Sequence, residues 1–332
     1  MKNLKKYPLL VCLIVSFVII IASALVVGLC GVNVGSSLGG GSQMEIVISD
    51  EANAGEYATT IKGILAKNKV GLDSCFTEDK VLAGSDNATF TSRVLIVKLT
   101  SSNISEETQE KIRQDISEKF EIDIENISQI SNIISPVNTQ NLLKVGLALG
   151  IIAACLFAFG FIRYNVFAGL SLLVSILHNL LMYFSLVILS RAQFNVNSLS
   201  IALVMTILML AAIINIFERN RELTNLHLND KLKSSQRLLE AEKSVISPYF
   251  VIVLSFILAV VLLFLVSAPT VRFIAINIAI ALVASIYTLL LVGPGVYAYF
   301  LDLKDYRENA RLSRNSEVNK HIKKKISKAN QK

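Results

Sequence analysis

The hydrophobic residues of this chain are gathered into long blocks, and polar residues fill the stretches between them. Six blocks are apolar over about 20 residues, the length that a helix needs to cross a hydrocarbon core of about 30 Å. The pattern predicts an α-helical polytopic membrane protein with six transmembrane helices. The predicted spans are Leu9–Cys30, Leu142–Ile162, Val166–Ser190, Leu199–Phe217, Pro248–Ser267 and Phe273–Phe300.

The first block follows three lysines, Lys2, Lys5 and Lys6, as a signal peptide would. Its apolar core is longer than the ~7 to 15 residues of a signal-peptide core, and no A-x-A cleavage site follows the block. We therefore interpret it as a membrane anchor.

Lysine and arginine in the flanks predict the orientation, because these residues concentrate on the cytoplasmic side of a membrane protein. The amino-terminal flank and the loop after the fourth block are basic, and the tail after Phe300 carries ten cations. We expect both termini to be cytoplasmic, in the cytoplasmic (inner) membrane. The segment Val32–Asn141 then lies outside, and it is acidic, with sixteen Asp or Glu against nine Lys or Arg.

These boundaries divide the chain into four regions. They are an N-terminal tail and first span (1–31), an extracytoplasmic α+β domain (32–141), spans two to six (142–300) with a cytoplasmic loop (218–247), and a basic cytoplasmic tail (301–332). We expect the basic tail to meet anionic lipid, and we expect no specific nucleic-acid binding. Of the four cysteines, only Cys75 lies outside the predicted spans and their ends, so no disulfide is expected within the outer domain.

The outer segment shows alternating strand and helix patterns. Strands are predicted over Gln43–Ile48, Arg93–Leu99 and Ile127–Ile134, and helices over Ala52–Ala66 and from Ser105, a Ser N-cap, to Lys119. Val70–Phe90 is poorly patterned, and we interpret it as a short strand over Leu72–Phe76 followed by a variable loop. The order predicts a small ferredoxin-like domain with helices on one side of an antiparallel sheet.

The fourth span ends in interleaved charges. The segment reads Phe217-Glu218-Arg219-Asn220-Arg221-Glu222. Taken alone, such a segment is typical of a solvated helix end. Its arginines can also stay on the cytoplasmic face, pair with acidic neighbours or bind phospholipid head groups.

Two further segments carry unusual residues for their positions. The first span is followed by a glycine-rich stretch, Gly35-Ser36-Ser37-Leu38-Gly39-Gly40-Gly41-Ser42. It suits either a flexible linker or a sharp turn from helix to strand, where glycine adopts φ values that other residues resist. The third span holds the polar pair His178-Asn179.

Together these segments resemble SecF, the six-span subunit of the SecD/SecF protein-export complex, which is related to the resistance-nodulation-division transporters. That family carries F-D-R-I-R-E at the cytoplasmic end of span four, G-I-D-F-x-G-G-S after span one and a His-Asp pair in span three. The last span, with Ser285-Ile286-Tyr287 and Gly293-Pro294, is also similar to the family's closing helix. Span order and the single large outer domain agree as well.

The resemblance implies an accessory subunit of the Sec protein translocase. Such a subunit assists preprotein export across the cytoplasmic membrane, and its outer domain grips the emerging preprotein. The implied partners are a SecD-like subunit, the SecY channel complex and the translocating preprotein. The resemblance also implies a link to the proton motive force, through proton flow across the spans.

The chain departs from the family where protons would be carried. The family's span-four aspartate falls at Ala211 or Ala212, and Asn179 replaces the second acid. The intramembrane polar candidates that remain include His178, Asn179 and Asn215, and Lys243 precedes span five. His178 alone among them titrates near neutral pH, so it is either a proton relay or an interhelical hydrogen-bonding residue.

Other classes of protein remain open at this point. An exporter half of the resistance-nodulation-division type, for small molecules or lipids, would need a substrate pocket among the spans. A receptor or adhesin would be expected to have fewer spans. We expect no enzyme and no cofactor, because the sequence has no P-loop, no His/Cys/Asp metal cluster and no G-x-S-x-G motif.

Overall fold

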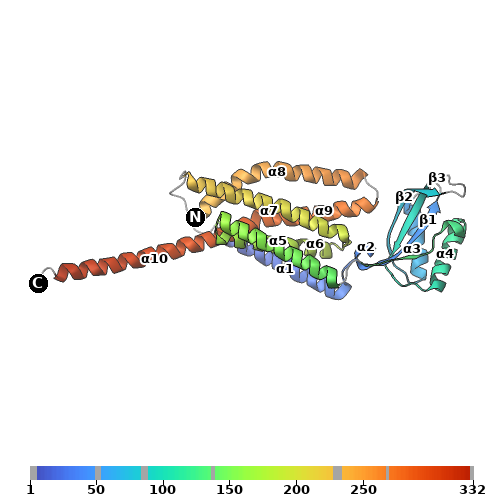
Figure 1. The fold of residues 1–332 in the computed structure, drawn as a ribbon, viewed down its shortest axis with the longest axis horizontal. Coiled ribbons are helices and arrows are strands. Elements are labelled where there is room, and N and C mark those ends of the chain that lie inside the picture. The colour runs from blue at the N-terminus through green and yellow to red at the C-terminus, as the bar shows by residue number, and fades with distance from the viewer. Residues whose placement is uncertain are drawn as a thin grey trace.

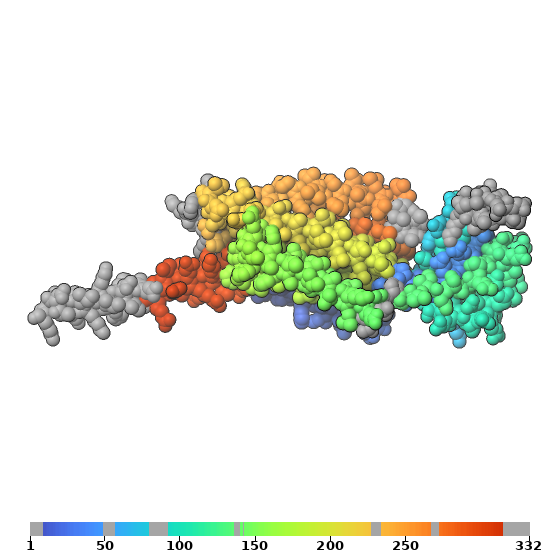
Figure 2. Space-filling view, viewed as in Figure 1, coloured from blue at the N-terminus to red at the C-terminus, as the bar shows by residue number. Residues whose placement is uncertain are grey.

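The computed structural model describes residues 6–48, 54–83, 89–135, 139–226, 234–266 and 269–329. Long helices run side by side in a bundle, and a small α+β domain lies beyond one end of it (Figure 1). The chain leaves the opposite end of the bundle in α10. The space-filling view shows the bundle as a continuous body between the domain and α10 (Figure 2).

The apolar blocks fold into the long helices of the bundle. These are α1 (Lys6–Cys30), α5 (Thr139–Arg163), α6 (Val166–Leu189), α7 (Val196–Asn225), α8 (Ser234–Val266), α9 (Pro269–Tyr287) and α10 (Gly293–Ala329), with a π-helical turn (Thr288–Val292) between the last two. Six stretches of the described helices are long and apolar enough to cross a membrane, which confirms the predicted class of six-span membrane protein.

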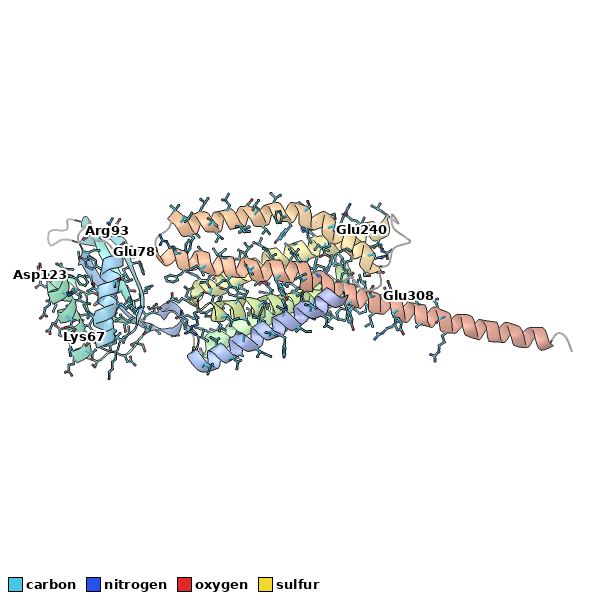
Figure 3. All side chains as sticks on the ribbon, turned by 180° about the vertical axis from the view of Figure 1, so that it is seen from behind. Lys67, Glu78, Arg93, Asp123, Glu240 and Glu308 are labelled. Atoms are coloured by element: carbon cyan, nitrogen blue, oxygen red, sulfur yellow. The ribbon has the colours of Figure 1, made fainter. Side chains whose placement is uncertain are left out.

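Charged residues mark the two ends of this bundle. Figure 3 labels six of them, and each lies in the α+β domain or at the opposite end of the bundle: Lys67, Glu78, Arg93, Asp123, Glu240 and Glu308. Large apolar side chains instead cover the outer faces of α1, α5 and α8. An apolar band between charged ends is what a hydrocarbon layer requires.

The loop predicted over residues 218–247 is largely helical where the structure describes it. Helix α7 continues past Phe217 to Asn225, and α8 begins at Ser234 and runs through Pro248. The predicted loop came from loss of hydrophobicity, but the charges after Phe217 pair at helical spacing within α7, as in Arg219 with Glu222 at 2.7 Å. Residues 227–233 lie outside the described part of the chain.

The α+β domain has the predicted ferredoxin-like order. Its strands are β1 (Gly41–Ile48), β2 (Leu72–Ala83), β3 (Thr89–Leu99) and β4 (Ser131–Ile133), and its helices are α3 (Ala54–Lys67) and α4 (Glu106–Phe120). The strands form an antiparallel sheet in the order β2-β3-β1-β4. Helices α3 and α4 cover the same face of the sheet (Figure 1). Their contact with that face forms the core, which includes Met44, Ile46, Ile61, Leu65, Leu95, Val97, Ile112 and Ile116.

Three strands differ from the prediction, and β3 begins at Thr89, four residues before the predicted Arg93. The strand over Leu72–Phe76 continues to Ala83, because β2 pairs with β3 along its whole length, a partnership that local patterning does not reveal. The last strand is shorter than Ile127–Ile134, since Ile127 makes only an isolated bridge to Ile46. Helix α4 begins as predicted, with the Ser105 hydroxyl accepting from the Thr108 backbone N–H.

The glycine-rich segment after α1 is an ordered turn in this structure. Gly35 precedes the short helix α2 (Ser36–Gly39), and Gly40 has a φ of 79°, in the left-handed region that favours glycine. A Cβ added to Gly41 would overlap the carbonyl oxygen of Leu99. The buried Ser42 hydroxyl then donates to the Ser101 carbonyl at 2.7 Å. The glycines therefore allow β1 to start close against β3.

Cys75 is a built-in reporter of this domain's stability. Its side chain packs against the domain core, and burial raises the pKa of its thiol to about 11. Little of the thiol is then the thiolate, the form that alkylating reagents attack, near neutral pH. Labelling of Cys75 should therefore depend on opening of the domain.

We predict that Gly41→Ala destabilises the domain by about 1–3 kcal/mol, because the new methyl group overlaps β3. Alkylation of Cys75 in the full-length protein, followed by peptide mass spectrometry, should be at least about fivefold faster than in wild type. Gly63→Ala is the matched control, since a Cβ at that position in α3 meets open space. Equal labelling of the two variants would contradict the packing argument.

Candidate functional site in the helical bundle

Helix α6 carries a column of buried polar side chains through the bundle. They lie on the face that packs against the other helices, and two of them are adjacent in the sequence: Ser171, Ser175, His178, Asn179 and Ser185. Helix α6 is placed centrally, in contact with α1, α5, α7, α9 and α10. Its polar groups therefore have to find their partners inside the bundle.

His178 is the centre of this column. Its Nε2 lies 2.9 Å from the Ser16 hydroxyl of α1, and its Nδ1 lies 2.8 Å from the Thr288 hydroxyl of the π-helical turn. The residue is only 8% exposed. One imidazole thus joins three segments that lie far apart in the sequence.

Tyr287 completes the cluster around His178. Its ring stacks on the imidazole with centroids 5.7 Å apart, and its hydroxyl donates to the Cys12 carbonyl at 2.7 Å. The Ser16 hydroxyl also donates to Cys12, at 2.8 Å. With both hydroxyl protons directed at Cys12, Ser16 can accept from His178 Nε2–H, and Nδ1 can accept from Thr288. A neutral ring with its proton on Nε2 fits this donor arrangement.

A π-helical turn positions Thr288 against the histidine. Such turns are rare, and they occur often at functional sites. The Gly293 N–H bonds to the Thr288 carbonyl across the turn, and the Gly293 carbonyl accepts from Ser171 of α6 at 2.7 Å. Pro294 follows without a backbone donor. The irregular backbone is therefore anchored on the same helix that carries His178.

Asn179 makes a second interhelical contact. Its Nδ2 donates to the Thr206 hydroxyl of α7 at 2.8 Å, while its Oδ1 has no partner among the described residues. A buried acceptor of this kind is usually satisfied by water. An amide cannot ionise, so Asn179 can orient a proton donor but cannot carry charge.

Polar contacts continue toward the end of α6 nearest the α+β domain. The Tyr183 hydroxyl lies 3.1 Å from the Ser198 carbonyl and 3.2 Å from Asn277 Oδ1. Ser23 of α1 donates to Ser185 at 3.1 Å. Side chains able to exchange hydrogen bonds thus occur along most of α6, although the hydrogen bonds among the described residues do not join them into one unbroken chain.

Asn215 stands apart from this column. It is exposed on α7 and lines a cavity of about 220 Å³ between α7, α8 and α9, together with Ala211 and Ala212. These two alanines occupy the positions where the resemblance placed a family aspartate. The structure therefore shows a space, and no carboxylate, at that point.

Glu242 is the one buried ionisable carboxylate among the described residues, at 7% exposure on α8. Sequence analysis missed it, because it fell in a stretch interpreted as a loop. Its neighbour Lys243 is exposed and takes no part in the hydrogen bonds around His178.

The signature segment, Phe217–Glu222 at the end of the fourth span, makes both aromatic packing contacts and ion pairs. Phe217 is 1% exposed, with its ring centroid 5.9 Å from that of Tyr164 and 4.5 Å from that of Tyr297. Glu218 accepts from Arg163 of α5 at 2.9 Å. The segment therefore ties α5, α7 and α10 together at the end of the bundle far from the α+β domain.

A separate set of contacts joins the α+β domain to the bundle. Asp73 of β2 accepts from the Ser36 backbone N–H at 3.0 Å and from the side chain of Gln193, in the turn between α6 and α7. The backbone of Phe194 in the same turn bonds to Asn33 and Gly35. These contacts would therefore transmit a movement of the α+β domain to the ends of α6 and α7.

The residues that contact His178 could largely not be predicted from the sequence. Tyr287 was named as part of the last span's resemblance to the family, and Ser16 and Thr288 were not singled out. A polar residue within an apolar block was the available signal in each case. Nothing local indicates which of these residues meet, because they come from three different helical segments.

Comparison with known proteins supports this description. Residues 110–302 match the family described as protein export membrane protein SecD/SecF, C-terminal. A crystal structure of SecDF in its super-membrane-facing form has a TM-score of 0.70 and 14% identity, over 92% of this chain and 40% of that one. A crystal structure of SecDF, a translocon-associated membrane protein from Thermus thermophilus, has a TM-score of 0.61 and 16% identity, over 89% and 38%.

The chain spans about two fifths of the length of these solved structures. No curated protein matches it. The helices and the position of the α+β domain define the class of the protein. It is a multi-pass membrane protein, and the α+β domain lies between its first and second spans. The family match extends over more than half of the sequence, and the chain belongs to the SecD/SecF family of protein export membrane proteins.

We predict that Thr288→Val destabilises the bundle by about 0.6–2 kcal/mol, because it leaves His178 Nδ1 without a partner inside apolar surroundings. Thermal unfolding of the purified protein in detergent should show a lower midpoint, and Thr288→Ser should restore it. Ser255→Ala is the control, since that hydroxyl is exposed and bonds only within α8. An equal decrease of the unfolding midpoint in Ser255→Ala would contradict a special role for the His178 cluster.

Proposed function

We propose that this chain is a SecF-like accessory subunit of the Sec protein translocase, acting without enzymatic chemistry of its own. The observation that carries the proposal is the family match over residues 110–302, which covers part of the outer domain and spans two to six. The four segments that resemble SecF agree with it. The solved structures that share the fold are titled as SecDF, and one as translocon-associated.

The proposed orientation follows from the cations at one end of the bundle. Arg163, Arg219 and Arg221 lie at the end far from the α+β domain, where α10 also leaves the bundle. Positive charge favours the cytoplasmic side. The α+β domain then lies outside the cytoplasmic membrane, where it can meet a preprotein emerging from the SecY channel.

The proposed function includes partner binding, for which the apolar side chains on the outer faces of α1, α5 and α8 are available when lipid does not cover them. A SecD-like subunit and the SecY complex are the proposed partners. An exporter half of the resistance-nodulation-division type is the alternative. It would work as a homo-oligomer or alone.

We predict that mild-detergent affinity purification of the tagged chain from its native membranes recovers a SecD-like protein, together with SecY. Mass spectrometry of the eluate identifies them, and an unrelated tagged multi-pass protein serves as the control for carry-over. Recovery of the chain alone or as a homo-oligomer would contradict the proposal and favour the exporter.

Coupling to the proton motive force is a further part of the proposal. His178 has hydroxyl partners on both ring nitrogens, and hydroxyl groups can donate or accept. The cluster can therefore accommodate the neutral or the protonated ring. With no carboxylate among the described residues of the His178 cluster, a SecD-like partner would supply the rest of a proton path.

We predict that His178→Ala abolishes the stimulation of preprotein export by the proton motive force in membrane vesicles. Ser255→Ala is the control, because it removes an exposed hydroxyl that lies outside the His178 cluster. It should retain stimulation when both variants have similar thermal stability. Wild-type stimulation in His178→Ala would leave the histidine a structural role only.

A further inference from the structure

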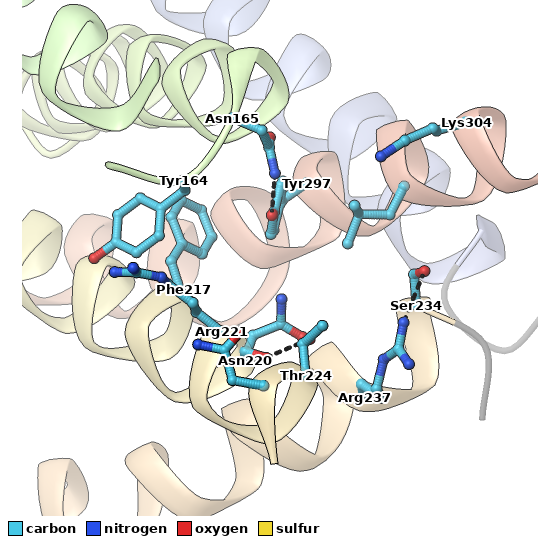
Figure 4. Close-up of a pocket in the computed structure, with 12 residues that line it drawn as sticks. Tyr164, Asn165, Phe217, Asn220, Arg221, Thr224, Ser234, Arg237, Tyr297 and Lys304 are labelled. Atoms are coloured by element: carbon cyan, nitrogen blue, oxygen red, sulfur yellow. Dashed lines mark hydrogen bonds between the residues drawn. The ribbon is translucent and has the colours of Figure 1, made fainter. Parts of the chain in front are cut away.

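A polar pocket of about 260 Å³ lies at the end of the bundle far from the α+β domain (Figure 4). Its walls come from the α5–α6 junction and from α7, α8 and α10. The lining residues are Tyr164, Asn165, Phe217, Asn220, Arg221, Thr224, Asn225, Ser234, Arg237, Tyr297, Leu301 and Lys304. Three of them are cations, and none is acidic.

The three cations come from three different helices, Arg221 from α7, Arg237 from α8 and Lys304 from α10. Lys304 makes no ion pair with a described residue. Arg237 donates through Nη2 to Ser234 at 3.3 Å, but its Nε is buried without a partner among the described residues. An unpartnered buried guanidinium N–H is costly, and a bound anion would satisfy it.

Two acids among the described residues lie beside these cations. Glu218 is bound to Arg163 at 2.9 Å and lies 3.8 Å from Arg221. Asp305 accepts from the Ser234 hydroxyl at 3.1 Å and from its backbone N–H at 3.4 Å. Neither carboxylate is among the lining residues. Among the described residues, the lining of the pocket therefore carries an excess of positive charge.

Neutral donors supplement the cations. The Asn220 side chain points into the pocket in Figure 4, beside Thr224. The Tyr297 hydroxyl accepts from Asn165 Nδ2 at 2.8 Å, so its own proton is available to a ligand. Phe217, Asn220, Arg221 and Thr224 follow one another at helical spacing, which means that one face of the signature segment forms a wall of the pocket.

An apolar groove of about 360 Å³ adjoins the pocket and shares Arg221 with it. The groove is lined by Phe159, Ile162 and Arg163 of α5. Phe159 is 44% exposed and Ile162 is 82% exposed. A cationic pocket next to an exposed apolar groove fits a ligand with an anionic head and a hydrocarbon chain.

We infer that this pocket binds the phosphate head group of an anionic phospholipid, with an acyl chain lying along Phe159 and Ile162. Arginine binds phosphate oxygens through paired N–H donors, and lysine adds a compact charge. Inorganic phosphate has the same head-group chemistry, but it would leave the groove uncovered. The site rests on this geometry alone, independently of the role in protein export.

The test is native mass spectrometry of the full-length protein in neutral detergent, titrated with phosphatidylglycerol, phosphatidylcholine or inorganic phosphate. Wild type should bind phosphatidylglycerol about tenfold more tightly than phosphatidylcholine. The double variant Arg237→Gln/Lys304→Gln should lose about that factor, since a charge-assisted hydrogen bond contributes about a factor of ten or more. Lys304→Gln alone, at an exposed position, should show a smaller loss in the same direction.

The control is Arg307→Gln/Arg311→Gln, which removes the same charge from exposed positions farther along α10. It should bind phosphatidylglycerol as wild type does. Equal affinity of wild type for the two lipids, or equal loss in the control, would overturn the site. Displacement of phosphatidylglycerol by an equal concentration of inorganic phosphate would overturn the lipid assignment.

Discussion

The bundle depends on one constraint, which is that polar groups within apolar helices have to be satisfied by one another. His178 meets this constraint by bonding to Ser16 of α1 and to Thr288 of the π-helical turn. The same bonds fix the position of α1 against α6. Because the chain passes from α1 through the glycine turn into β1, the placement of the α+β domain follows from this arrangement, with Asp73 and Gln193 securing the other contact.

The features that sequence predicted were those carried by neighbouring residues. Apolar blocks of sufficient length gave the spans, and Ser105 followed by acidic residues gave the start of α4. Features that depend on distant partners were missed or wrong. Strand β2 is held by its pairing with β3, which lies outside the local pattern of residues 72–83. The meeting of Ser16, His178 and Thr288 likewise has no local signal.

Membership of the SecD/SecF family relates these contacts to protein export membrane proteins. The polar column offers hydroxyl groups and one histidine, and Ala211 and Ala212 line a cavity at the expected position of an acid. A bundle built in this way can transmit movement between its helices and the α+β domain, through the contacts of Asp73 and Gln193. The charged end of the bundle has a distinct task, in which the signature segment packs through Phe217 and lines a cationic pocket.

The central claim is that this chain assists protein export. Pulse-chase labelling of secreted preproteins, in cells of the native organism depleted of the chain, tests it most directly. The account predicts slower conversion of preprotein to mature protein, with recovery when the chain is supplied again. Unchanged conversion in depleted cells, together with a defect in the efflux of small molecules or lipids, would contradict it.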